Sequence, residues 1–162
     1  MSWIDKEIKR RARDAEPVGK PVSDAPDPVR VIGDLWQRFE HANAALPDAL
    51  RLKLEHVEAP PRMGPHVRTW LRATNGAALG FAGDAIRYTW PERNASHSRN
   101  FWINWNPDLE RLELSQRVGS ATPPLMRRWR FDARRIEQLL QGLVTSRLVK
   151  PRSLRKRRLW LF

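Results

Sequence analysis

The stretch HVRTWLRATNGAALGFAGDAIRYTW, residues 66–90, decides the fold, because it contains three short apolar segments separated by turn signals. An Asn-Gly pair at 75–76 follows the first segment, and this pair is typical of a type I′ hairpin turn because both residues tolerate positive φ. A Gly-Asp pair at 83–84 separates the second segment from the third. Tight turns join antiparallel strands, so the stretch predicts an antiparallel meander.

Alternating segments continue on both sides of this stretch. ALRLKLEH (49–56) alternates apolar with charged residues, as a half-buried strand does. Three further segments, NFWINW (100–105), RLELSQR (111–117) and LMRRWRF (125–131), follow after turn sequences. Together the segments predict about five to seven short strands.

Two amphipathic helices are predicted, one on each side of these strands. Asp27 and Pro28 are typical of a helix N-cap and first helical position, and this helix should end near Pro47. Its apolar residues at helical spacing are Ile32, Leu35, Trp36, Phe39, Ala42 and Leu46. Asp132 is predicted to cap the second helix, which should end before Pro151. Its apolar stripe consists of Ile136, Leu139, Leu140, Leu143 and Leu148.

This order of elements predicts a single α+β domain, with an antiparallel meander flanked by an N-terminal-side and a C-terminal-side helix. Both helices are expected on one face of the sheet. We expect the domain to span residues 28–150, since a chain of 162 residues suits one core. Residues 1–27 are interpreted as an N-terminal arm with a proline-rich linker, and residues 151–162 as a basic C-terminal tail.

The composition is that of a globular chain, with 41% hydrophobic and 30% charged residues. Cysteine is absent, which excludes disulfides, thiolate zinc sites and cysteine nucleophiles. The first residues contain no apolar signal-peptide region, and no run approaches the length of a membrane span. We therefore expect a bacterial protein located in the cytoplasm.

The net charge of +12 is concentrated at the carboxyl-terminal end of the chain. Residues 116–162 contain 13 Lys and Arg but 2 Asp and Glu, whereas the preceding residues are almost balanced. A concentrated positive field attracts polyanions such as nucleic acid, anionic lipid or an acidic protein surface. The cations predicted to form a polyanion-binding surface are Arg127, Arg128, Arg130, Arg134, Arg135, Arg147, Lys150, Arg152, Arg155, Lys156, Arg157 and Arg158.

Alternation along the strands also predicts a second surface on the sheet. If the aliphatic and most aromatic residues, Val67 among them, face the helices, the opposite face carries Arg68, Trp70, Arg72, Arg87, Trp102, Asn104, Arg128 and Arg130. Trp70 and Trp102 are then candidates for stacking on bases, with the arginines neutralising phosphates. The alternative is that the arm or the tail covers both tryptophans, with arginines extending around them.

The chain ends on four apolar residues, Leu159, Trp160, Leu161 and Phe162, directly after the four cations at 155–158. This ending fits a last strand or plug in the core, or a peptide that docks a partner. It also fits a weak contact with an anionic membrane surface. In the fourth interpretation the apolar end anchors the tail to the fold while the cations at 155–158 bind phosphates. The sequence leaves these four interpretations open.

No set of residues predicts catalysis or a metal site. The four histidines share no ligand spacing, and no phosphate-binding or nucleophile motif occurs. His97 and Arg99 in NASHSRN (94–100) could form an anion site, although a solvated hairpin loop explains them better. We therefore expect a binding protein without cofactor rather than an enzyme, although an enzyme acting on a polyanion stays as a third class.

The leading hypothesis is a nucleic-acid-binding or nucleoprotein-associated accessory protein that uses its basic C-terminal region. The alternative is a small subunit or adaptor of a larger assembly, which docks an acidic partner or an anionic membrane surface through its C-terminal helix and tail. The sequence does not indicate an oligomeric state.

Overall fold

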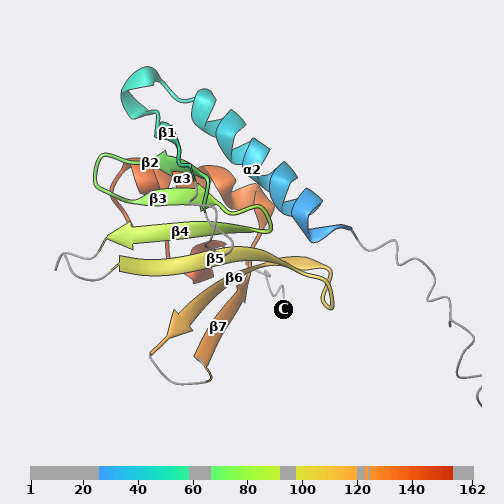
Figure 1. The fold of residues 1–162 in the computed structure, drawn as a ribbon. Coiled ribbons are helices and arrows are strands. Elements are labelled where there is room, and N and C mark those ends of the chain that lie inside the picture. Colours follow the sequence, from blue (N-terminus) through green and yellow to red (C-terminus); the bar gives the residue numbers. More distant parts are fainter. Residues whose placement is uncertain (1–25, 59–66, 92–97, 120–122, 124, 155–162) are drawn as a thin grey trace, which may run out of the picture.

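The computed structural model describes residues 26–58, 67–91, 98–119, 123 and 125–154, and it shows an α+β fold built on one antiparallel sheet (Figure 1). Seven strands follow one another in space in the same order as in the sequence. They are β1 (Lys53–His56), β2 (Thr69–Arg72), β3 (Ala78–Phe81), β4 (Ala85–Pro91), β5 (Ser98–Asn106), β6 (Arg111–Val118) and β7 (Leu125–Arg130). The predicted meander is confirmed.

Helix α2 (Pro28–Ala44) begins where the sequence predicts it. Asp27 Oδ1 accepts a hydrogen bond of 3.1 Å from the amide of Val29, and Pro28 occupies the first turn, where no intrahelical donor is needed. The ring of Trp36 stacks on Phe81 of β3 with 5.5 Å between the ring centroids. The apolar stripe of α2 therefore faces the sheet.

Helix α3 (Ile136–Val144) is shorter than predicted. Asp132 accepts a hydrogen bond from the Arg134 amide, but it caps the 3₁₀ helix η2 (Ala133–Arg135) that leads into α3. The helix ends before Pro151, as predicted, but it does not extend to Leu148, because Ser146 has a φ of 58° and closes a Schellman motif. In this motif the Ser146 and Arg147 amides donate to the carbonyls of Leu143 and Gly142, at 3.4 and 2.9 Å. The chain then folds back, so that the side chain of Val149 lies against Gly142.

Both helices cover the same face of the sheet, as predicted (Figure 1). The buried side chains on this face come from α2, α3 and strands β2 to β6. They include Ile32, Leu35, Trp36, Phe39, Leu71, Leu79, Ile86, Tyr88, Phe101, Ile103, Leu114, Ile136, Leu139, Leu140 and Leu143. The molecule thus has two layers, with the apolar core between the helices and one side of the sheet.

Two predictions about shorter segments are wrong. The strand predicted at 49–56 begins at Lys53, since Asp48–Leu50 form the 3₁₀ helix η1 and Leu50 is exposed. The Asn-Gly turn is not of type I′, because Gly76 has a φ of 86° while Asn75 is not among the residues with positive φ. Asn75 Oδ1 instead accepts a hydrogen bond of 3.0 Å from the amide of Ala77.

The folded part of the chain continues past Lys150. The 3₁₀ helix η3 (Pro151–Leu154) ends on Leu154, which is fully buried and whose carbonyl oxygen accepts a hydrogen bond of 3.3 Å from the amide of Asp132. Residues 1–25 of the predicted arm and 155–162 of the predicted tail lie outside the described residues. Within the described ranges, no helix is long and apolar enough to span a bilayer.

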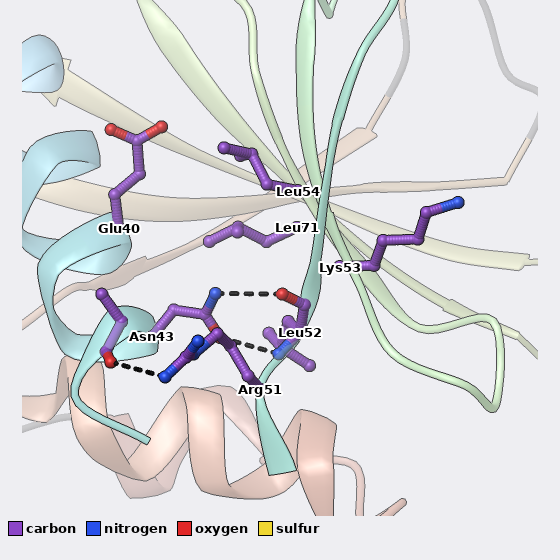
Figure 2. A pocket seen from close by; sticks show the side chains of 8 residues that line it. Glu40, Asn43, Arg51, Leu52, Lys53, Leu54 and Leu71 are labelled. Atoms are coloured by element: carbon purple, nitrogen blue, oxygen red, sulfur yellow. Dashed lines mark hydrogen bonds between the residues drawn. The ribbon is translucent and has the colours of Figure 1, made fainter. Parts of the chain in front are cut away.

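Two side-chain hydrogen bonds of Asn43 link the last turn of α2 to Leu52, the residue before β1 (Figure 2). Its side chain is buried, and its Nδ2 donates to the carbonyl of Leu52 (3.0 Å) while its Oδ1 accepts from the Leu52 amide (2.8 Å). One side chain thus satisfies both backbone polar groups of a buried residue.

We expect the substitution Asn43→Ala to lower the free energy of unfolding by about 1–3 kcal/mol, because the amide and carbonyl of Leu52 lose their partners. Urea denaturation measures this change. Gln37→Ala, at an exposed position of the same helix, is the control and should change stability by about 0.5 kcal/mol or less. Equal stability of the two variants would contradict the role given to Asn43.

Candidate nucleic-acid interface

The sheet face opposite α2 and α3, here named the outer face, carries polar, charged and aromatic side chains. Strand register and alternation place the following residues on it: Lys53, Glu55, Trp70, Arg72, Arg87, Trp102, Asn104, Arg111, Glu113, Ser115, Arg117, Arg128 and Arg130. One row of directly paired positions crosses the whole sheet, in the order Glu55, Trp70, Gly80, Arg87, Trp102, Ser115 and Arg128. The two tryptophans therefore share this row with two arginines.

The start of β2 departs from simple alternation. Thr69 pairs with Phe81, yet the amide of the preceding Arg68 also donates to the Phe81 carbonyl at 3.0 Å, so two residues oppose one. This is the pattern of a β-bulge, which shifts the side chains before it to the other face. Val67, predicted to face the helices, accordingly lies against Gly80 beside Trp70.

Trp70 is half-buried and contacts neighbouring groups on β2 and β3. A Cβ added at Gly80 would lie 2.8 Å from the Cε3 and Cζ3 atoms of the Trp70 ring, so the ring rests directly on the backbone of β3. The guanidinium carbon of Arg72 lies over the ring, 4.6 Å from its centroid. Arg72 Nε in turn donates to Glu55 Oε2 at 2.6 Å, and Lys53 Nζ lies 3.0 Å from Glu55 Oε1. Hydrogen bonds from Lys53 and Arg72 hold the pKa of Glu55 below its ordinary value.

Trp102 lies in a different electrostatic environment. The guanidinium carbon of Arg87 is 5.6 Å from the Trp102 ring centroid. Arg87 donates from Nε and Nη2 to Asn100 Oδ1, at 3.1 and 2.9 Å, and this amide oxygen also accepts from the hydroxyl of Thr89. The amide of Asn100 is neutral and does not offset the charge of Arg87, whereas the carboxylate of Glu55 offsets part of the charge of Arg72.

Glu113 is a buried carboxylate on the β6–β7 side of the outer face, with 5% of its surface exposed. Arg111 binds its Oε1 from Nε and Nη2, at 3.0 and 2.7 Å. Burial opposes ionisation of this group, but hydrogen bonds from Arg111 and Asn106 and the charges of Arg111 and Arg128 outweigh it and hold the Glu113 pKa below its ordinary value of 4.5.

The predicted polyanion-binding cations are spread over several elements. Arg128 and Arg130 lie on the outer face, and Arg127 lies on the other side of the same strand. Arg134 and Arg135 are in η2, Arg147 and Lys150 follow α3, and Arg152 is in η3. The cations at 155–158 and the apolar residues at 159–162 lie outside the described residues.

Arg117 also lies on the outer face, although it was not among the residues predicted there. It lies two residues after Ser115 on β6 and pairs with Met126 of β7. The alternation in RLELSQR, with Leu112 and Leu114 facing the core, was the signal that could have found Arg117.

Two hollows lie elsewhere on the molecule. One, of about 650 Å³, lies between the end of α2 and β1, and Glu40, Lys53, Leu54 and Leu71 are among its lining residues (Figure 2). The other, of about 540 Å³, lies between α2 and α3 beside His41. Among the described residues, no three histidines or carboxylates come together as a metal site. His97 lies outside those residues, and Arg99 is exposed on β5.

Gly80→Ala tests the contact between Trp70 and β3. We expect it to lower the free energy of unfolding by about 1–3 kcal/mol, since the new Cβ would overlap the Trp70 ring and the Val67 side chain. Gly33→Ala in α2 is the control, because its Cβ would meet no atom within 4 Å and alanine favours a helix by about 1 kcal/mol. Urea denaturation measures both, and an unchanged stability of Gly80→Ala would refute this packing.

Glu113→Gln tests the buried ion pair through pH. A carboxylate with a lowered pKa stabilises the fold above its ordinary pKa of 4.5, and this contribution is lost as the pH falls through the folded-state value. We expect the variant to be about 1.5–3 kcal/mol less stable at neutral pH, with the deficit shrinking in acid. Urea denaturation from pH 7 to 3 measures the trend. Glu110→Gln, an exposed carboxylate in the same hairpin, is the control, and a deficit independent of pH would contradict the ion pair.

Comparisons with known proteins give no further assignment. No protein-family model matches this chain, and no curated protein or solved structure is significantly similar to it.

Proposed function

We propose that this protein binds nucleic acid through the β6–β7 side of the outer face, by contacts between arginine side chains and phosphates. The observation that carries the proposal is the exposure of three arginine side chains on neighbouring strands, Arg117, Arg128 and Arg130. Across the described part of the chain, none of these three makes an ion pair with a carboxylate. Unpaired guanidinium groups are well suited to bidentate phosphate contacts.

The charge balance of this side of the sheet supports the proposal. Arg111, Arg117, Arg128 and Arg130 surround one carboxylate, Glu113, which is already occupied by Arg111. Among the described residues, Arg117, Arg128 and Arg130 therefore give this side of the sheet an excess of positive charge over the one carboxylate. Such a field attracts a polyphosphate backbone with little sequence preference, and binding releases counterions from the nucleic acid.

A second candidate, an adaptor for an acidic protein partner, is favoured by the position of β7. This strand is the last in the sheet order, so its outer edge has no neighbouring strand among the described residues. Leu125 and Met126 are 62% and 37% exposed on it, beside the exposed Arg127. An acidic segment could add to this edge as a further strand.

The proposal predicts binding that weakens steeply with salt. Fluorescence anisotropy of a labelled oligonucleotide, titrated with the full-length protein between about 50 and 200 mM KCl, gives the slope of log Kobs against log salt. The double variant Arg128→Gln/Arg130→Gln should reduce this slope by about 1.4 for a single strand, or about 0.7 for each lost phosphate contact.

The matched control is Arg30→Gln/Lys53→Gln, which also removes two exposed cations, one from α2 and one from the opposite edge of the sheet. Its slope should equal that of the unmodified protein. Absence of binding at the lowest salt would overturn the proposal. Displacement of the oligonucleotide by poly-L-glutamate at equal charge concentration would overturn it in favour of the acidic-partner candidate.

A further inference from the structure

We infer that Trp102, and not Trp70, is the position at which this protein stacks an unpaired base, and that its ligand is therefore a single-stranded nucleic acid. This inference rests on the proposed function and adds the ligand class and the contact that selects it. The sequence treats the two tryptophans alike, since both lie on the outer face, whereas their surroundings in the structure differ.

The ring of Trp70 is already in contact with protein groups. Its Cε3 and Cζ3 atoms rest on Gly80, and the guanidinium of Arg72 lies 4.6 Å from its centroid. The 2.6 Å bond to Glu55 fixes Arg72 in this position. A base could stack there only after breaking that ion pair, and the carboxylate of Glu55 would repel the phosphates that accompany the base.

Trp102 has neighbours that favour a nucleotide. Its ring is half-buried on the interior strand β5, and the guanidinium of Arg87 lies over it at 5.6 Å from the centroid, farther than Arg72 lies from Trp70. Arg87 donates to the amide oxygen of Asn100, which carries no charge to offset that of the guanidinium. On the other side, Ser115 pairs with Trp102, and the exposed Arg128 follows in the same row.

In this row the Trp102 ring lies between two cations, one on each side of β5. Arg87 is one strand from Trp102 and Arg128 is two strands away, about 5 and 10 Å across the sheet. A chain whose bases lie against the sheet can carry its phosphates to both cations. Bases in a duplex are paired and stacked inside the helix and cannot reach a ring on a sheet surface, so this contact selects single strands.

Three probes of about 20 nucleotides test the inference with the full-length protein: oligo(dT), an abasic oligonucleotide with the same phosphates, and a duplex. Stacking of one base is expected to make oligo(dT) bind about 5- to 150-fold more tightly than the abasic chain. Trp102→Leu should abolish this preference while leaving the affinity for the abasic chain unchanged. Trp102→Phe, which keeps an aromatic ring, should retain most of it.

Trp70→Leu is the matched control and should keep the preference for oligo(dT). The preference is the ratio of the affinities for oligo(dT) and for the abasic chain, both measured on the same protein preparation. If part of a variant is unfolded, both apparent affinities fall by the same factor, and the ratio does not change. Circular dichroism identifies any variant that does not fold, and Trp102→Met, which also lacks an aromatic ring, then replaces Trp102→Leu in the comparison.

The outcomes separate this inference from the proposed function. Equal affinity for oligo(dT) and the abasic chain in the unmodified protein, with salt-dependent binding of both, would overturn the stacking contact and leave phosphate binding in place. Loss of the preference in Trp70→Leu but not in Trp102→Leu would overturn the choice of tryptophan. Binding of none of the three probes would overturn both proposals.

Discussion

The register of the seven antiparallel strands is the constraint on which the rest of this structure depends. Each strand pairs with its sequence neighbour, so the alternation of every strand must agree with the next one across the whole sheet. Because the strands are in register, the aliphatic residues lie together under α2 and α3, and the arginines and tryptophans lie on the outer face. A shift by one residue in β5 alone would turn Trp102 toward the helices and Ile103 toward the outer face.

The same register gives the outer face a gradient of charge. At the β1 edge the carboxylate of Glu55 binds both Lys53 and Arg72, so half of the positive charge of this group is offset. Toward β7 the described strands place Glu113 on this face, and it is buried and bound by Arg111 beside three further arginines. A meander keeps the strands in sequence order across the sheet. Part of the cluster of cations late in the sequence therefore lies together at the β6–β7 side of the outer face.

Much of this could be predicted from residue patterns, and the exceptions have identifiable physical causes. Strand alternation was enough to place Trp70, Trp102, Arg128 and Arg130 on one face, since period-2 patterns depend on local geometry alone. The end of α3 before Leu148 was not predicted, because its left-handed residue is Ser146 rather than the usual glycine. The difference between the tryptophans depends on Glu55 and Gly80, which reach Trp70 only through pairing between strands, and no single segment encodes that pairing.

The burial of Leu154 has a consequence for how the chain folds during synthesis. The strands pair locally and require little loop closure, which favours early formation of the sheet. The core, however, takes side chains from Ile32 in α2 through to Leu154, so its apolar layer is completed only when the end of the described chain has emerged from the ribosome. Until then the part of the apolar face that α3 and Leu154 cover stays exposed even if α2 has already docked, and this exposed surface favours aggregation of the nascent chain.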